Sequence, residues 1–543
     1  MRDAHFRFEI ADLRIEDIHR WLQNRYILMA VVLLCNIAYF ALMALVLPMQ
    51  YDVNDDVMMC MIANGTYSGT PDCHLVYINV IYGYVLAWLY SLTTAIEWYT
   101  LSFVVLHILS MSVLSYSLLT IPNRARWERA LWLVLIYVLW ARFIVSLQFT
   151  TTAGLVCLAG CVLLLRGTPR SQWTGVVLVV IAALIRFMAA GLVGLLMAPI
   201  ILYTLGRRWQ TYIPIVVMLL LVVGCRVVNN HVYDSDIEWK NYREYNQLRA
   251  QLNDNPNAYR LYPDQLPEGV DVNDYRLLMG FIPDPEQIDL VRIRQLYAMV
   301  DSVPYRQQWR NLHRLDKYAV ELSILLGLLV LMIITTGNRR KYIFLIVYSI
   351  FVLALIVHVS LDGFLKNRVF LCMLLPILMT DFMLLPSTTG KKRKWGIIIV
   401  MLLLCGKYTW QTVQTSIEKY YARYNWTRLQ QPILDYVPDD AYVITLGAYM
   451  NMEAVNPWHV WQYPFHKYVL GWMTWIPFNT PVASSHRGLL RPDMYIFTSN
   501  DYSREKTVVP RIQEQLEKHY GISTYVYPIC HNGKYALVQL RAE

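Results

Sequence analysis

Long apolar stretches are the feature that most limits what this chain can fold into. Of its 543 residues, 56% are hydrophobic and only 16% are charged. Several stretches of roughly 15 to 25 residues carry almost no charge, which is the length that crosses about 30 Å of hydrocarbon. We therefore predict a polytopic α-helical membrane protein. The net charge of +9 does not indicate a nucleic-acid partner, because the cations lie in short clusters between apolar stretches, as in cytoplasmic loops.

The distribution of lysine and arginine predicts how the apolar stretches cross the membrane. With about eleven spans, the inner short segments hold 19 Lys and Arg residues, and the outer ones hold four: Arg142, Arg186, Lys366 and Arg368. This asymmetry places the N-terminus in the cytoplasm and the C-terminus outside, in the plasma membrane. The predicted spans lie near 26–48, 98–120, 127–145, 149–165, 173–187, 189–205, 211–228, 318–336, 341–358, 368–386 and 395–411.

Two apolar stretches need a separate interpretation. Residues 77–92 are apolar enough to cross, but counting them as a span would put the basic clusters outside. We therefore predict an amphipathic helix that lies in the outer interface. Residues 174–205 are long for one helix and short for two. Since both flanks are basic, we predict a hairpin with Arg186 near its outer tip.

The polar regions predict the domain organisation. Residues 1–25 form a cytoplasmic tail, and residues 26–411 form a transmembrane module with an acidic outer loop (49–97) and a long outer loop (229–317). Residues 412–543 form a small extracytoplasmic α/β domain. In the long loop we expect helices near 239–252 and 286–301. In the C-terminal domain we expect strands at 441–446, 494–498, 525–529 and 535–540, and a helix at 508–520.

The acidic outer loop contains no Lys or Arg but carries Asp52, Asp55, Asp56 and Asp72. Asp55 and Asp56 begin a short predicted helix, where either could be an N-terminal capping acid. The alternative is that one of them, partly desolvated beside the bilayer, is a general base toward an acceptor hydroxyl. Two adjacent carboxylates would also push one pKa upward, toward a useful range.

The four outer cations, Arg142, Arg186, Lys366 and Arg368, interrupt or begin apolar runs. An arginine in hydrocarbon costs about 2.5 to 3.5 kcal/mol or more, so each needs a partner. They could reach lipid headgroups or pair with Asp362 or Glu97. Alternatively they converge on a phosphate or pyrophosphate that enters from the membrane, to which arginine gives bidentate contacts. Because three separate spans each place a cation at the same depth, we take the four as candidate ligands of a lipid phosphate.

Softer signals complete the candidate residues. An aromatic segment of the C-terminal domain either docks on the membrane or bundle, or offers platforms for a sugar acceptor through Trp458 and Trp461. Two histidines there, His459 and His466, have no carboxylate or cysteine to complete a metal site. No phosphate-cradling glycine loop, Walker motif or zinc-protease helix is present in the sequence. A divalent cation is the one cofactor that we leave open.

The acidic loop also holds two cysteines. Cys60 and Cys73 could form a disulfide on the outer side of the membrane.

The acidic loop resembles a family motif. Asp55-Asp56-Val-Met-Met-Cys-Met-Ile-Ala-Asn-Gly65 is followed by His74-Leu-Val-Tyr-Ile-Asn-Val-Ile-Tyr-Gly-Tyr-Val-Leu-Ala-Trp-Leu-Tyr90. Together with the order of spans and the outer C-terminal domain, this resembles the GT-C superfamily of integral membrane glycosyltransferases, such as the protein O-mannosyltransferases and lipid A aminoarabinose transferases. In the family an Asp-Glu pair leads the helix and a His/Pro-rich turn opens the next one. Here the second acid is Asp56 and the prolines of the turn are absent.

The resemblance implies a polyprenyl-phosphate sugar donor, an inverting transfer and Asp55 in the place of the catalytic base. It also points to His74 and Tyr77, which open the interfacial helix, as substrate-binding residues. The expected partners are the lipid-linked donor, a glycan, lipid or protein acceptor and membrane lipids, with no nucleic acid. We keep two alternatives. A polysaccharide polymerase or ligase would bind lipid pyrophosphate through outer arginines and the 229–317 loop. A non-enzymatic lipid or solute transporter would need ionisable groups at mid-membrane.

Overall fold

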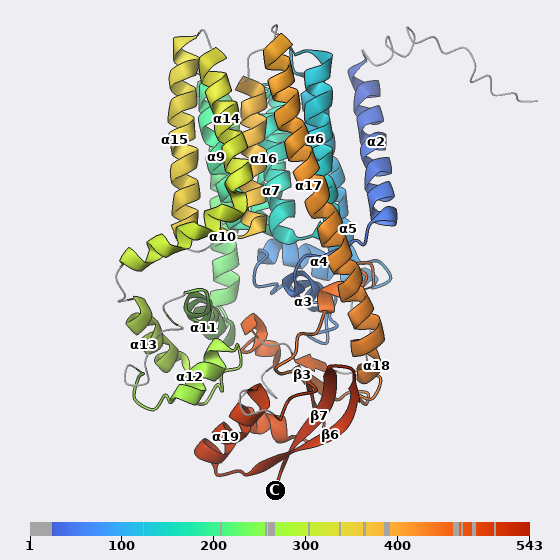
Figure 1. Cartoon of the computed structure of the whole chain (residues 1–543), viewed down its shortest axis with the longest axis vertical. Coiled ribbons are helices and arrows are strands. Elements are labelled where there is room, and N and C mark those ends of the chain that lie inside the picture. Colours follow the sequence, from blue (N-terminus) through green and yellow to red (C-terminus); the bar gives the residue numbers. More distant parts are fainter. Residues whose placement is uncertain are drawn as a thin grey trace, which may run out of the picture.

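The computed structural model describes residues 24–543 apart from 123, 207–208, 256–257, 259–265, 302–304, 336–337, 362–364, 385–390, 460–465, 469–470, 480–484 and 504–506. In this part of the chain, a bundle of helices forms one half of the molecule, and a smaller mixed unit lies beyond one end of it (Figure 1). We call that end the domain end. The short helices α3 (Asn54–Ala63) and α4 (Val80–Leu92) lie between the bundle and the smaller unit.

A helix covers every stretch predicted as a span. These helices are α2 (Arg25–Val46), α5 (Trp98–Thr120), α6 (Arg126–Val145), α7 (Phe149–Leu165), α8 (Pro169–Ile185), α9 (Phe187–Leu205), α10 (Ile213–Asp234), α14 (Ala319–Thr335), α15 (Arg339–Leu361), α16 (Asn367–Leu384) and α17 (Lys391–Asn425). Among the described residues, 7 helices are long and apolar enough to cross a membrane, and α7 and α8 are apolar but shorter. The predicted class, a multi-pass helical membrane protein with a C-terminal sheet domain, is confirmed; the number of spans stays a prediction.

Helix α7 is the centre of the bundle, because almost all of its side chains are buried and it packs against α5, α8, α9 and α16. Small residues let α8 approach it closely. A Cβ added at Gly160 of α7 would lie 2.8 Å from the carbonyl oxygen of Gly175 on α8. Close backbone approach of this kind is typical of helices that pack within a membrane.

The stretch 174–205 is divided into two helices that contact each other, as the predicted hairpin requires; that both of its ends lie on one side of the membrane stays a prediction. Helices α8 and α9 meet at Arg186, which ends one helix and begins the other. Its backbone N–H donates to Ala182 and its carbonyl accepts from Ala190, so the break between the helices is a single residue wide. This geometry puts the Arg186 side chain at the domain end of the bundle.

The long polar loop and the C-terminal domain form the smaller unit. The loop contains α11 (Ile237–Asp254), α12 (Val272–Met279) and α13 (Leu290–Asp301), of which α12 was not predicted. The domain contains a sheet in the order β4-β3-β5-β7-β6 and one long helix, α19 (Val508–Tyr520). The strands β3 (Tyr442–Thr445), β5 (Met494–Ser499), β6 (Thr524–Asn532) and β7 (Tyr535–Ala542) confirm the predicted ones, and β4 (His466–Tyr468) was missed.

The sheet is mixed. Strand β3 pairs in parallel with β4 and β5, while β7 pairs antiparallel with both β5 and β6.

Helix α17 links this domain to the bundle, because it continues unbroken past the predicted domain boundary at 411–412 and ends beside the sheet (Figure 1). A rigid helix across the boundary fixes the position of the domain at the domain end.

Candidate functional site

A two-residue parallel pair, β1 (Gln50–Tyr51) with β2 (Ser146–Leu147), brings the beginnings of α3 and α7 together. Asp56 in the first turn of α3 reaches α7: its Oδ1 accepts hydrogen bonds from the backbone N–H of Phe149 (3.0 Å) and the hydroxyl of Tyr99 (2.9 Å). Asp56 is therefore a capping acid, as one of the predicted alternatives had it, but the helix that it caps is α7 rather than its own.

Complete burial distinguishes Asp56 from its neighbour. Burial raises the pKa of Asp56 well above its usual range; the hydrogen bond from Tyr99 opposes this rise and the charge of Asp55 adds to it. A carboxyl group that has no access to solvent, and whose one oxygen is occupied by two protein donors, is poorly placed to take a proton from a substrate. Asp56 therefore has the properties of a structural group.

Asp55 points the other way, toward the C-terminal domain. Its Oδ1 accepts a hydrogen bond from the indole Nε1 of Trp472 (2.9 Å). The ring of Trp472 in turn lies edge-on against Tyr77, with centroids 5.1 Å apart. Asp55 is only partly buried, and among the described residues no other hydrogen bond engages its carboxylate. One carboxylate oxygen is thus held in place while the other is available.

Tyr77 is the meeting point of the site. The guanidinium carbon of Arg186 lies 5.2 Å from the ring centroid of Tyr77 and 5.2 Å from that of Phe149. Burial raises the pKa of Tyr77, and the charge of Asp55 raises it further, while Arg249, Arg186 and Arg368 all lie close enough to lower it. We call Asp55, Tyr77, Arg186, Arg249 and Arg368 the Tyr77 group.

The Tyr77 group has an excess of positive charge. It contains three arginines and one carboxylate, and none of the three arginines forms an ion pair within the part of the chain that the structure describes. The charges of Arg368 and Asp55 both act on Arg186, and so does that of Arg226 on α10. Arginines that are partly desolvated and crowd one another without counter-ions create a site for an anion.

Two other predicted cations lie apart from this group. The guanidinium of Arg142 donates to the carbonyl oxygen of Gln411 (3.2 Å) and to the hydroxyl of Thr415 (2.9 Å), both on α17. Lys366 is exposed, just before α16. Their part in phosphate binding stays a prediction.

Two acids were expected as alternative partners of the outer cations. Glu97 accepts hydrogen bonds from Cys60 (3.0 Å) and from Tyr90, and Asp362 lies outside the described residues.

His74 lies near the Tyr77 group but is occupied by protein contacts. Its ring stacks on Trp239 with centroids 4.3 Å apart, and its Nδ1 is 2.8 Å from Oδ1 of Asp72. Burial disfavours the imidazolium, but the hydrogen bonds to Asp72 and Cys73 and the charge of Asp72 outweigh this effect and raise the pKa of His74 to about 9. His74 therefore adds a positive charge at the edge of the site, and its ring is held by protein contacts.

The aromatic candidates divide. Trp458 is 37% exposed and lies in a turn whose Pro457 carbonyl accepts from Thr100 (2.5 Å). Trp461 lies outside the described residues. Both remain predictions as acceptor platforms.

Cys60 and Cys73 are free thiols, so the disulfide proposed for them is wrong. Cys60 is instead buried against Glu97 and Tyr90.

The sequence reasoning missed two residues of the site. Trp472 was only one of several aromatics in the C-terminal domain, and nothing in the sequence relates it to Asp55. Arg249 lies on a helix that was predicted, at seven- and four-residue spacing from Tyr242 and Tyr245. That spacing puts the three side chains on one helix face. This pattern was the only feature of the sequence that could have indicated Arg249 as a candidate residue.

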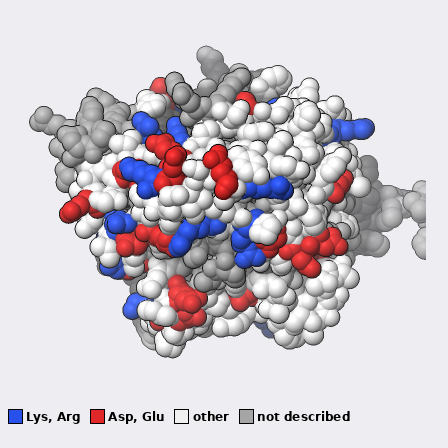
Figure 2. Space-filling view, turned by 90° about the horizontal axis from the view of Figure 1, so that it is seen from below, with Lys and Arg blue, Asp and Glu red and all other residues white. Residues whose placement is uncertain are grey.

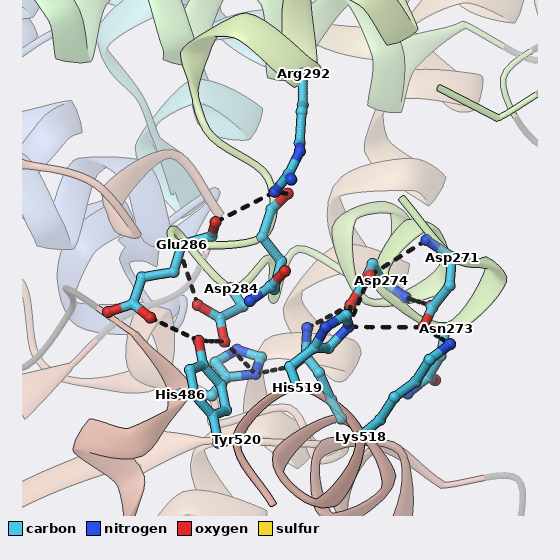
Figure 3. A network of polar contacts seen from close by, with 12 residues as sticks. Asp271, Asn273, Asp274, Asp284, Glu286, Arg292, His486, Lys518, His519 and Tyr520 are labelled. Carbon is cyan, nitrogen blue, oxygen red and sulfur yellow. Dashed lines mark hydrogen bonds and ion pairs between the residues drawn. The ribbon is translucent and has the colours of Figure 1, made fainter. Parts of the chain in front are cut away.

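Two sets of possible metal ligands occur among the described residues, and both are already bonded. Asp72, Cys73 and His74 hydrogen-bond among themselves. Asp271 and Asp274 of α12 and His519 of α19 form the other set (Figure 3). There, the Nζ of Lys518 lies 2.6 Å from Asp271, so a cation would have to displace a lysine. These contacts hold α12 against α19 of the C-terminal domain.

The rest of the smaller unit carries balanced charge. Figure 2, the face seen from below Figure 1, shows acidic and basic side chains intermixed. Several are paired, as Arg294 is with Glu244 (2.5 Å) and Arg487 with Glu286 (2.6 Å). The arginines of the Tyr77 group, which form no ion pair among the described residues, differ in this respect from the paired charges of the smaller unit.

No family model and no curated protein matches the chain. A crystal structure of ArnT from Cupriavidus metallidurans in the apo state is similar to it, with 12% sequence identity, coverage of 96% of this chain and 98% of that chain, and a TM-score of 0.42. A crystal structure of ArnT from the same organism bound to undecaprenyl phosphate is similar with 13% identity, the same coverage and a TM-score of 0.40. ArnT is a lipid A aminoarabinose transferase, one of the GT-C enzymes that the acidic loop was found to resemble.

Proposed function

We propose that this protein transfers a sugar from a polyprenyl-phosphate donor to an acceptor on the outer side of the membrane, with inversion at the sugar carbon. The observation that supports the proposal is the Tyr77 group, in which a carboxylate and three arginines act on one tyrosine; among the described residues one oxygen of that carboxylate accepts no hydrogen bond and none of the arginines forms an ion pair. A lipid phosphate that carries a sugar has an anionic group for the arginines and a reactive carbon for an attacking hydroxyl.

In the proposed reaction, Asp55 takes the proton of the acceptor hydroxyl as its oxygen attacks the anomeric carbon. The hydrogen bond from Trp472 holds the carboxylate in place. The bond between the sugar and the phosphate breaks, and the phosphate leaves with one more negative charge than it had in the donor. Arg186 and Arg368 stabilise that developing charge, which is the part of catalysis that preorganised cations perform best. A single base on the face opposite the phosphate gives inversion.

The polymerase or ligase alternative would use the same arginines but would not need Asp55. A transporter would need neither the base nor product formation. Asp55 is therefore the residue on which the three hypotheses differ, and Asp56 is its matched control, because it is the adjacent carboxyl group with a structural contact.

The test is a transfer assay with purified protein, polyprenyl-phosphate sugars and extracted envelope glycans and lipids as acceptors. Asp55→Asn keeps the contact to Trp472 and should lower the rate by roughly 10²- to 10⁴-fold, the usual contribution of a general base. Asp56→Asn should keep most of the activity. Arg186→Ala should lower the rate by about 10²-fold or more, because it removes charge stabilisation of the leaving phosphate.

Three results would count against the proposal. Full activity of Asp55→Asn would remove Asp55 as the base and favour a ligase. Loss of activity only in Asp56→Asn, with the protein folded, would exchange the roles of the two acids. Lipid scrambling by the protein in vesicles, with no product from any lipid-linked sugar, would favour the transporter.

A further inference from the structure

One face of α11 is turned toward the Tyr77 group and the C-terminal domain. Tyr242, Tyr245 and Arg249 follow at helical spacing along that face. The hydroxyl of Tyr242 donates to the carbonyl oxygen of Trp472 (2.8 Å), the residue that holds Asp55. The ring of Tyr245 stacks on Trp475, with centroids 3.7 Å apart and planes 6° from parallel. The long loop is thus packed directly against the candidate site.

Arg249 on this face is buried but has no acidic partner. It is 5% exposed, and its guanidinium donates to two amide oxygens of its own helix, those of Asn246 (2.8 and 3.1 Å) and Asn253 (3.2 Å). Among the described residues it forms no ion pair. A guanidinium has five N–H groups, so each of its terminal nitrogens keeps one donor. Its carbon lies 5.7 Å from the ring centroid of Phe281, which also shields it from water.

Two further polar atoms, on Tyr245 one helical turn before Arg249 and on the Trp475 ring that stacks on Tyr245, are buried and unsatisfied within the described part of the chain. They are the hydroxyl of Tyr245, a residue that is 1% exposed, and the indole Nε1 of Trp475. A buried polar atom without a hydrogen-bond partner destabilises the fold by roughly 1–3 kcal/mol. Here two such atoms occur on two rings that stack on each other. The two carboxylates whose charges act on Tyr245 are engaged elsewhere: Asp289 accepts from the backbone N–H of Arg292 (2.8 Å), and Asp284 accepts from the hydroxyl of Tyr520 (2.9 Å).

These three groups have one chemistry in common. A guanidinium and an indole N–H can only donate hydrogen bonds, and a tyrosine hydroxyl can donate. Free hydrogen-bond donors together with a buried cation would repel another cation and would stay unsatisfied against an apolar group. An oxyanion supplies both the acceptor atoms and the negative charge. The charge of Arg249 acts on both Tyr245 and Tyr77, so this residue belongs both to the donor set and to the Tyr77 group.

We propose that Arg249, Tyr245 and Trp475 form a second phosphate subsite, next to the one formed by Arg186 and Arg368. The inference rests on the proposed function and deepens it, because it adds a second anionic group to the substrates. That group has two sources: a phosphate on the acceptor, or a second phosphate on the donor lipid, in which case the donor is a polyprenyl diphosphate and not the monophosphate proposed above. The subsite lies on the long loop, so the loop selects the substrate and does not merely cover the site.

The experiment measures binding, not transfer, on the full-length protein in lipid nanodiscs. Isothermal titration compares polyprenyl monophosphate, polyprenyl diphosphate, and inorganic phosphate added to protein saturated with the monophosphate. The variants are Tyr245→Phe and Arg249→Gln. Tyr245→Phe removes a hydroxyl that has no described protein partner, so it should not lower the melting temperature. Arg294→Ala is the matched control, an exposed arginine of the same loop paired with Glu244.

The two sources give different results. If the donor carries the second phosphate, the wild type binds the diphosphate about tenfold or more tightly than the monophosphate, and both variants lose that preference. If the acceptor carries it, the two lipids bind equally, and inorganic phosphate binds alongside the monophosphate in the wild type but about tenfold more weakly in the variants. In both cases Arg294→Ala behaves as the wild type.

The proposal is overturned if neither the diphosphate preference nor the binding of inorganic phosphate depends on Tyr245 and Arg249. Should Arg249→Gln fail to fold, Tyr245→Phe decides alone. Failure of the proposed function gives a different pattern, in which monophosphate binding itself is insensitive to Arg186→Ala and no sugar is transferred.

Discussion

At the scale of single residues, the molecule shows how two adjacent carboxyl groups acquire opposite properties. Asp55 and Asp56 have the same covalent chemistry and lie in the same helical turn. Asp56 is completely buried and caps α7, whereas Asp55 is partly exposed and faces arginines. The sequence identified the pair but left the choice between them open, because the direction of each side chain depends on helices that are distant in sequence.

The environment of Asp56 gives a stability prediction. Because burial raises its pKa above the value in the unfolded chain, its contribution to stability is full at low pH and is lost as the pH rises through the raised pKa. Asp56→Asn, which cannot ionise and keeps an oxygen for the two hydrogen bonds, should therefore melt less pH-dependently than the wild type. Thermal melts between pH 4 and 9 measure this. Asp56→Ala, which also removes the cap, should lose about 0.5–2 kcal/mol at every pH.

His74 gives a prediction in a different pH window. Its pKa of about 9 exceeds the value of about 6.5 in an unfolded chain, so its stabilising contribution is present below pH ~6.5 and is lost between pH ~6.5 and 9. The melting temperature of the wild type should fall across this window more than that of His74→Gln. An equal fall in both proteins would mean that the pair with Asp72 does not hold the imidazolium.

At the scale of elements, the arrangement depends on contacts that local pattern does not encode. Hydropathy predicted the helices because each span needs one long apolar run. It did not predict that α7 is the central helix, since all spans have similar composition. The strand pair β1–β2 was too short to be recognised, although it sets the positions of both acids.

The close approach of α7 and α8 can be tested by replacing two glycines with alanine, one at the contact between the helices and one away from it. Gly160→Ala places a Cβ 2.7 Å from a side-chain carbon of Val179 and 2.8 Å from the Gly175 carbonyl, so it should cost roughly 1–3 kcal/mol. Gly191→Ala on α9 meets no atom within 4 Å and should be neutral or stabilising by up to about 1 kcal/mol. Melting temperatures in one detergent compare the two. Equal effects would contradict the tight packing of the two helices.

At the scale of the whole molecule, the candidate site is made by four parts of the chain that no single domain contains. The acidic loop supplies Asp55 and Tyr77, the bundle supplies Arg186 and Arg368, and the long loop and C-terminal domain supply Arg249 and Trp472. The site therefore forms only when the smaller unit is seated on the domain end of the bundle.

The orientation of the molecule is a prediction at this scale. The basic clusters place the N-terminus in the cytoplasm and the domain end outside. Alkaline phosphatase fused to the C-terminus should be active in cells, and a fluorescent protein that folds only in the cytoplasm should be dark at the same position. The same two reporters joined to the N-terminus should give the opposite pattern. A fluorescent C-terminal fusion would reverse the topology and put the site on the cytoplasmic side.

The sequence by itself determined the class of fold, the positions of the membrane-spanning helices and most of the strands, because the length of an apolar run and the alternation of apolar and polar residues are local properties of the sequence. It also placed the acidic pair and the outer arginines as candidates. Only the tertiary structure decided which acid faces the arginines, that Arg142 turns to α17, and that Arg249 and Trp472 complete the group. Those choices depend on packing between segments up to several hundred residues apart, and the direction of a side chain across such a contact is not a local property of its sequence.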